Sequence, residues 1–188
     1  EVFVLEKTGD GIEQISQVLQ QRQDVDAVHI ISHGSPGTLY LGNAQLSLDT
    51  FNYYINQLQQ WDIRNLLLYG CNVAAGDAGE EFIAKLYNLT GAEIAASRTL
   101  TGNADKGGNW ELEVNPGQQK PALAFKTSVM AAYEGVLTQT NNFDQPDQFI
   151  FGNSDSIVPN LNLILSDGSN LLVNTVDTGW INSKNGNF

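Results

Sequence analysis

The sequence predicts an α/β fold: a mostly parallel sheet with helices on both faces, followed by a β-rich C-terminal extension. Two observations lead to this fold class. Short apolar runs recur along the N-terminal half of the chain, and segments with the periodicity of amphipathic helices separate them. Strands that alternate with helices form parallel sheets, and helices then cover both faces of such a sheet.

The first elements have clear signals. Residues 2–5 predict a short buried strand, and residues 11–22 carry apolar side chains at helical spacing. A second apolar run, residues 27–31, predicts the next strand. Residues 38–41 and 44–46 fit a small hairpin, because a Gly-Asn pair between them suits a tight turn.

A helix is expected over residues 48–60, where Ser47 is in position to cap its first turn. The leucine-rich run at residues 66–69 then predicts the third strand. Its residues are continuous in apolar character, which is typical of a strand buried on both faces of a parallel sheet.

The next helix is expected to start at Asp77, because Asp77 and Glu80 have the spacing of a capping box. Gly91 is placed to end it. Residues 93–96 predict a fourth strand, and residues 110–114 alternate like a half-buried strand.

Two parts of the chain differ in composition. Residues 1–137 hold the α/β pattern and form the predicted domain. Residues 138–188 begin with a polar linker and continue with a β-rich extension. Within it, residues 161–165 and 171–176 predict a hairpin through a tight Asp-Gly turn.

Composition excludes several function classes. The 188 residues carry a net charge of −12, and 9 basic residues are too few for a nucleic-acid footprint. No apolar stretch is long enough to span a membrane. The polar, lysine-poor tail favours a secreted or cell-surface bacterial protein, with a cytoplasmic location as the alternative.

We expect no required cofactor and no metal site. Calcium binding stays open as an alternative, because the chain is acidic and resembles a surface protein in composition; the tail residues considered for it share one feature. They are spaced like turn residues and form no EF-hand pattern; they are Asp144, Asp147, Asp155 and Asp167.

The residues with the most chemical information follow the second and third strands. His33 comes directly after residues 27–31 and a serine, and Cys71, the only cysteine, follows residues 66–69 and a glycine. Carboxyl ends of parallel strands meet at one edge of a sheet. A thiol and an imidazole there are the minimum for a cysteine nucleophile with a histidine partner. The alternative is an inert buried cysteine that acts as a small apolar residue.

Neighbouring residues refine this hypothesis. A helix begins shortly after Cys71, so we expect its free N–H groups to favour the thiolate and lower the thiol pKa. The backbone N–H groups of Gly34 and Cys71 could together form an oxyanion hole. We expect His29, deeper in the same strand, to be a core histidine that is hydrogen-bonded to a neighbour.

Three motifs together resemble the caspase-like (clan CD type) cysteine peptidase fold. They are VHIISHG at residues 28–34, TLYLG at residues 38–42 and LLLYGC at residues 66–71. The helix that follows, with Gly79 and Phe82, fits as well. Residues 1–137 resemble bacterial caspase-like domains of the CHAT type. They are still closer to the uncharacterised caspase-like domain of large bacterial surface proteins with repeats.

The resemblance implies a cysteine endopeptidase with Cys71 as nucleophile and His33 as its partner, without an obligatory third member. Gly34 would help to bind the oxyanion. The implied substrate is a polypeptide, with the chain's own longer precursor among the candidates. Caspase-like sheets usually carry one more strand before residues 2–5, so we expect a strand to be missing.

Acidic residues near the sheet edge are candidates for a pocket that selects Arg or Lys in the substrate. They are Asp77, Asp105 and Glu80. Two of them have equally simple explanations, since Asp77 suits a helix cap and Asp105 suits a solvated loop.

Two other functions compete with the endopeptidase. A catalytically silent module of the same fold, serving adhesion or assembly, would suit the polar tail and the missing strand. A doubly wound ligand-binding domain has less support, because residues 7–11 lack the pattern of a Gly-rich phosphate loop.

Overall fold

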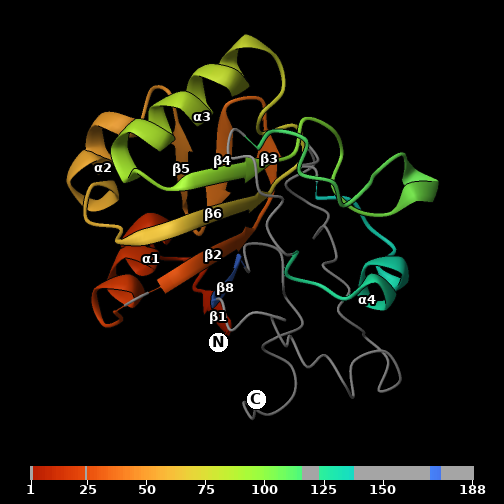
Figure 1. Ribbon diagram of the computed structural model, residues 1–188, viewed down its shortest axis with the longest axis horizontal. Helices are drawn as coiled ribbons and strands as arrows, with labels where there is room; N and C mark the ends of the chain where they lie inside the picture. Colours follow the sequence, from red (N-terminus) through yellow and green to blue (C-terminus); the bar gives the residue numbers. More distant parts are fainter. Residues whose placement is uncertain (1, 24, 116–122, 138–169, 175–188) are drawn as a thin grey trace.

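The protein is built on a parallel sheet (Figure 1), seen in a computed structural model that describes residues 2–23, 25–115, 123–137 and 170–174. The sheet has five strands in the order β1-β8-β2-β6-β7, and every neighbouring pair is parallel. These strands are β1 (Val2–Leu5), β8 (Asn170–Asn174), β2 (Val25–Ile31), β6 (Ile63–Tyr69) and β7 (Glu93–Ala96). The predicted parallel sheet is therefore confirmed.

A second, antiparallel sheet of three short strands lies beside the first. It consists of β3 (Gly34–Ser35), β4 (Thr38–Leu41) and β5 (Ala44–Ser47), in that order. The pairing of β4 with β5 confirms the predicted hairpin through Gly42 and Asn43. Gly42 has a φ of +61°, which the tight turn requires and glycine adopts without strain.

Helices lie on both faces of the parallel sheet, as expected. The larger ones, on one face, are α1 (Gly11–Gln20), α2 (Phe51–Leu58) and α3 (Gly76–Thr90). The other face is covered by loops within residues 97–115 and 123–137, together with a 3₁₀ turn, η1 (Ala104–Lys106), and the short helix α4 (Thr127–Ala132). Figure 1 shows α3 and α4 well apart, and the two helices contribute to different core clusters.

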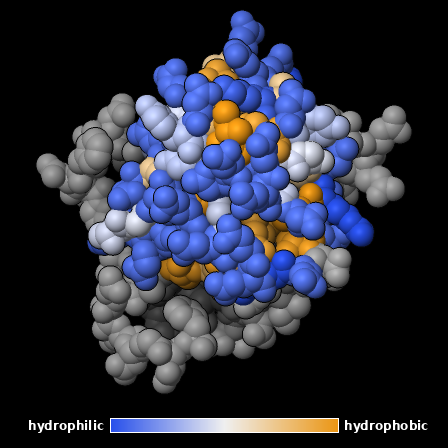
Figure 2. Space-filling view, turned by 90° about the vertical axis from the view of Figure 1, so that its left-hand side faces the viewer, coloured by the Kyte–Doolittle hydropathy of each residue, from blue (hydrophilic) through white to orange (hydrophobic). Residues whose placement is uncertain are grey.

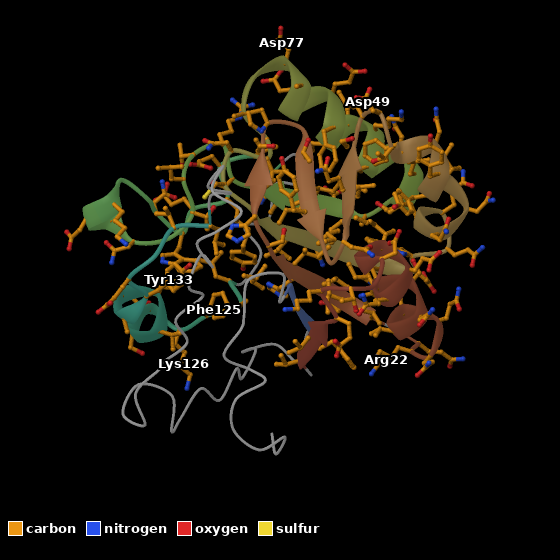
Figure 3. The ribbon with its side chains drawn as sticks, turned by 180° about the vertical axis from the view of Figure 1, so that it is seen from behind. Arg22, Asp49, Asp77, Phe125, Lys126 and Tyr133 are labelled. Carbon is orange, nitrogen blue, oxygen red and sulfur yellow. The ribbon has the colours of Figure 1, made fainter. Side chains whose placement is uncertain are left out.

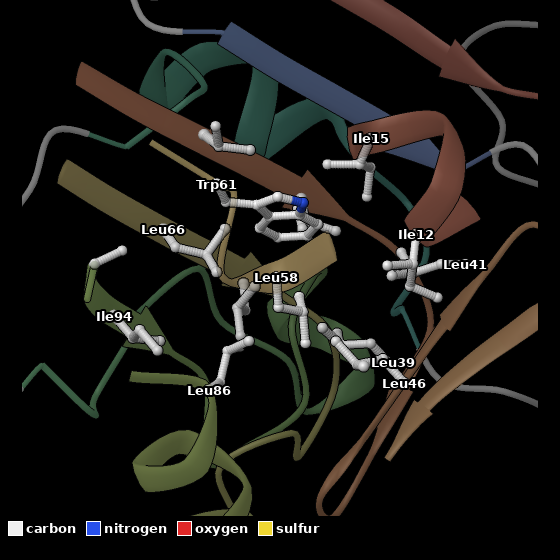
Figure 4. Close-up of a cluster of buried hydrophobic side chains, with 14 of the residues drawn as sticks. Ile12, Ile15, Leu39, Leu41, Leu46, Leu58, Trp61, Leu66, Leu86 and Ile94 are labelled. Atoms are coloured by element: carbon white, nitrogen blue, oxygen red, sulfur yellow. The ribbon is translucent and has the colours of Figure 1, made fainter. Parts of the chain in front are cut away.

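The main core lies between the parallel sheet, α1–α3 and the β3-β4-β5 sheet. Strand residues such as Val28 and Leu66 meet Ile12 of α1 and Leu86 of α3 there, and all four are fully buried. Figure 4 shows side chains from both sheets and from the three large helices converging on this cluster. Burial of these apolar groups provides most of the drive for folding.

A smaller apolar cluster covers the other face of the sheet. Its centre is an aromatic group in which Trp110 packs edge-to-face on Phe125 and on Tyr133, each at 5.4 Å between ring centroids. Tyr69 of β6 lies against the same rings. Cys71 belongs to this cluster.

The N-terminus of α1 is held by a charged cap. Asp10 accepts hydrogen bonds from the N–H groups of Ile12 and Glu13, at 2.8 and 3.0 Å. The Tyr54 hydroxyl of α2 donates to the same carboxylate at 2.7 Å. Burial and this hydrogen bond to Asp10 raise the pKa of Tyr54 to about 12, so the phenol stays protonated and links the two helices.

One face of the molecule is largely hydrophilic. Figure 2 shows the left-hand side of Figure 1 as mostly blue, with separate small hydrophobic areas. Exposed large apolar side chains include Tyr53 on α2 and Tyr87 on α3. Single exposed apolar residues of this kind are normal on a folded protein.

Two predicted helix starts are wrong. Ser47 does not cap α2, because that helix begins at Phe51, and Thr50 uses its hydroxyl to bond back to Ser47 and Gln45. Asp77 does not cap α3 either, because the helix begins one residue earlier, at Gly76. The carboxylate of Asp77 instead lies in the first turn, where the helix dipole favours it. Gly91 does end α3, with a φ of +70°.

The expected strand over residues 110–114 is also wrong. Only Val114 pairs, through a single antiparallel bridge to Ala96 at the end of β7. The alternation instead reflects Trp110 and Leu112, which pack on the aromatic cluster while Glu111 between them is exposed.

In the extension, residues 170–174 form β8, which lies between β1 and β2 and is parallel to both. The strand that pairs with β1 therefore comes from the extension and not from the start of the chain. The other half of the expected hairpin, residues 161–165, lies outside the described residues, as do residues 138–142 of the predicted linker. The division into two parts stays a prediction.

Replacement of Phe82 tests the main core. Phe82 of α3 is fully buried against Phe51, with ring centroids 5.1 Å apart. We expect Phe82→Ala to lower the free energy of unfolding by about 3–5 kcal/mol in urea denaturation, because the cavity cannot fully close. The control is Tyr53→Ala, which removes an exposed ring and should change stability by less than about 0.5 kcal/mol. Equal effects of both variants would contradict the described core.

Candidate functional site

The site lies where β2 and β6 end side by side. The two strands pair from Val25 with Ile63 up to Ile31 with Tyr69. His33 and Cys71 each follow two residues beyond that last pair. The structure therefore places both residues at one level of the same sheet edge, beyond the carboxyl ends of the strands.

Two glycines bring the chain segments into direct contact. A Cβ on Gly34 would lie 3.0 Å from the carbonyl oxygen of Cys71 and 2.4 Å from Val73, so no side chain fits there. A Cβ on Gly70 would lie 3.3 Å from the Cα of Gly34. The backbone after His33 thus packs on the backbone that carries Cys71.

The turn after Cys71 is fixed by Asn72. This residue has a φ of +59°, in the left-handed region that asparagine tolerates better than most residues. Its N–H donates to the carbonyl of Thr99 at 2.9 Å, and the N–H of Ala74 donates to the carbonyl of Ser97 at 3.0 Å. The loops after β6 and β7 therefore hold each other in place.

The thiol itself is enclosed. Cys71 has no exposed surface, and the N–H of Thr101 donates to its Sγ at 3.2 Å. The S–H in turn donates to the carbonyl of Thr101, at 3.7 Å. Thr101 is fully buried too, and no polar group of the described residues bonds its hydroxyl.

The expected acidic thiol is wrong for this form of the chain. Burial raises the pKa of Cys71 to about 11, although the N–H groups of Thr101 and Leu137 act in the opposite direction. The N-terminus of α3, which we expected to favour the thiolate, begins only at Gly76. Desolvation of the charged form outweighs the backbone donors around the sulfur.

His33 is also buried, with 4 % of its surface exposed. Its carbonyl accepts hydrogen bonds from the N–H of Tyr40 and from the hydroxyl of Ser32, at 3.2 and 3.1 Å. Gly34, the next residue, pairs with Leu39 in the small sheet. The antiparallel sheet therefore fixes the backbone on the C-terminal side of this histidine.

His29 is a core histidine, as predicted. Its Nδ1 lies 3.2 Å from the hydroxyl of Tyr69, and that hydroxyl accepts a hydrogen bond from the N–H of Ala124 at 2.9 Å. The Tyr69 proton is then available for donation to Nδ1. His29 thus anchors the segment that covers this face of the sheet.

The three candidate specificity residues are all exposed, and their role stays a prediction. Asp77 is exposed and projects from the start of α3, well apart from Phe125 and Tyr133 (Figure 3). Glu80 forms an ion pair with Arg98, at 3.0 Å. Asp105 is exposed in η1, where its backbone N–H bonds to Asn103.

Sequence reasoning missed Glu113. Its carboxylate accepts hydrogen bonds from the hydroxyl of Thr99 and the N–H of Arg98, both at 2.7 Å. Burial raises its pKa, but these hydrogen bonds outweigh that and hold the pKa below its ordinary value. The ionised carboxylate therefore fixes the loop to which Asn72 is bonded. The only available signal was the alternation around residues 110–114.

Sequence reasoning also missed Thr101, whose backbone contacts the sulfur. The residue type does not predict that role, because the contact uses main-chain atoms and joins residues 30 positions apart.

A family model described as "Domain of unknown function (DUF4347)" matches residues 1–137. No curated protein matches the chain, and no solved structure matches it. In the described part of the chain, no helix is long and apolar enough to cross a membrane. The described residues also contain no group of three or more side chains suited to hold a metal ion. The acidic tail residues considered for calcium lie outside the described ranges.

The buried thiol should make stability depend on pH. A thiol with a pKa near 11 in the folded chain and near 9 in the unfolded chain holds its proton more tightly when folded. The folded state should therefore lose stability as pH rises from about 9 to 11, by on the order of 2 kcal/mol. The measurement is the difference in unfolding free energy between wild type and Cys71→Ala across this range. A difference that does not change with pH would contradict the enclosed thiol.

Proposed function

The chain belongs to the DUF4347 family, and we propose that it is a caspase-like cysteine endopeptidase in which Cys71 is the nucleophile and His33 its partner. One observation carries the proposal. Gly34 packs on the Gly70–Cys71 backbone, so the segments that bear the imidazole and the thiol meet at the carboxyl edge of a parallel sheet. That edge is where α/β folds place their active sites.

The chemistry assigns a role to each group. Sγ of Cys71 attacks the carbonyl carbon of a peptide bond, while the thiol proton passes to the imidazole of His33. The N–H groups of Gly34 and Cys71 bind the oxyanion. The imidazolium then gives its proton to the leaving amine, and water hydrolyses the thioester to free the acid and restore the thiol.

Backbone donors next to the sulfur fit this role. The N–H of Thr101 donates to Sγ and stabilises the thiolate relative to an apolar site. The proposed substrate is a polypeptide, and the chain's own longer precursor is one candidate for it. The mechanism uses only protein groups and requires no cofactor. The polar tail supports action outside the cell or at its surface.

A second function is favoured by a specific observation. Cys71 has no exposed surface, and its pKa near 11 leaves almost no thiolate at neutral pH. A caspase-like module without catalysis, used for adhesion or assembly, would have such an inert thiol.

Peptide cleavage separates the two functions. We expect the wild-type chain to cleave a peptide library or its longer precursor, and Cys71→Ala to abolish cleavage because the nucleophile is gone. His33→Ala should lower kcat/KM by about 10²–10⁴, the usual contribution of a general acid or base. Mass spectrometry of the products provides the measurement.

The matched control for His33→Ala is His29→Gln. It changes the other histidine of the same strand, where a glutamine oxygen can still accept from Tyr69. Its activity should stay within about tenfold of wild type. Identical products and rates from wild type and Cys71→Ala would leave the silent module as the better function.

A further inference from the structure

The end of the α/β region lies as an extended segment beside the loop that encloses the thiol. We call residues 133–137 the strap. Its Leu137 N–H donates to the carbonyl of Thr101 at 2.8 Å, and its Gly135 carbonyl accepts from the N–H of Asn103 at 2.7 Å. Between these bonds, Val136 forms an antiparallel bridge with Gly102.

The strap and the thiol share the same partner. Thr101 binds Sγ through its N–H and binds the strap through its carbonyl. The N–H of Leu137 also acts on the sulfur, and the Leu137 side chain is fully buried in the cluster that holds Cys71. The burial of the thiol therefore depends on the closed position of the strap.

Glycine allows the strap to lie this close. Gly102 has a φ of +134°, and a Cβ there would lie 2.3 Å from the carbonyl oxygen of Gly135 and 2.8 Å from the Cα of Val136. A methyl group at this position must push the strap away, because the clash is with backbone atoms.

The strap is held less regularly than the sheet beneath it. Within the described residues it makes a single bridge rather than a ladder, and a side-chain bond from Asn103 to the carbonyl of Tyr133 secures its start. By contrast, β6 is paired on both edges. Segments with few backbone pairs open at lower free energy than central strands.

We propose that the strap is an autoinhibitory latch: while closed it seals Cys71 from polypeptides, and its transient release from residues 101–103 exposes the thiol while the sheet stays folded, so that the wild-type chain cleaves slowly and a released strap speeds cleavage. Its consequence for catalysis rests on the proposed endopeptidase, but the gating of the thiol does not.

A glycine pair tests the latch. Gly102→Ala should displace the strap and raise the rate of Cys71 alkylation by iodoacetamide at least about tenfold at constant pH. Gly76→Ala is the matched control: Gly76 also has a positive φ, +62°, but a Cβ there meets nothing within 4 Å. Its alkylation rate should stay within about twofold of wild type. Equal rates in the two variants would overturn the latch.

A measurement on the wild type does not depend on any variant folding. We expect the opening free energy from alkylation of Cys71 to equal that from hydrogen exchange of the Leu137 and Asn103 amides, which hold the strap. Both should be lower than the value for Leu67 in the centre of β6. If Cys71 reacts only with the opening of Leu67, the thiol is freed by global unfolding and the latch is wrong.

Peptide cleavage by the same samples separates this proposal from the previous one. Fast alkylation of Gly102→Ala without cleavage of any peptide would support the latch and contradict the endopeptidase proposal. If the wild-type thiol reacts as fast as a free cysteine and the chain cleaves peptides, the latch proposal is wrong and the endopeptidase proposal is supported.

Discussion

The parallel pairing of β2 with β6 is the constraint on which the rest of the structure depends. It brings the two strand ends level, so that His33 and Cys71 leave the sheet at the same edge. Because side chains alternate along a strand, a shift of one residue would move every side chain of β6 to the opposite face. Cys71 would then point into the main core, and the contact of Gly34 with Gly70 would be lost. The glycines make this register specific, because neither position has room for a side chain.

The two faces of the sheet have different tasks. On one face, Val28 and Leu66 pack under three regular helices and provide stability. On the other face, Leu67 and Cys71 lie under irregular loops held by aromatic packing and single bridges. A loosely paired cover suits a site that must open, since regular ladders resist local opening. The proposed latch would reconcile the enclosed thiol with the endopeptidase proposal, because the thiol would become accessible only when that cover opens.

Periodicity predicted most of the fold, because strands and helices buried on one side carry a local pattern. Residues 2–5 follow from such a pattern, whereas the hairpin and the end of α3 at Gly91 follow from the local signal of glycine at a turn and at a helix end. The helix caps predicted at Ser47 and Asp77 were wrong, since spacing alone does not determine which backbone N–H a side chain will reach. At the site, strand ends located His33 and Cys71. The raised pKa of the thiol could not be foreseen, because it depends on Thr101 and Leu137, which are distant in sequence and act through their backbones.

The most direct test of the account is the crystal structure of the chain with a peptidyl ketone inhibitor covalently attached to Cys71. The account predicts that the inhibitor oxygen lies about 3 Å from the N–H of Gly34. It also predicts that the His33 imidazole lies beside the new carbon–sulfur bond, and that residues 133–137 are displaced from residues 101–103. An adduct in which His33 lies away from the inhibitor, with Gly34 making no contact to its oxygen, would contradict the claim that the two strand ends form one catalytic site.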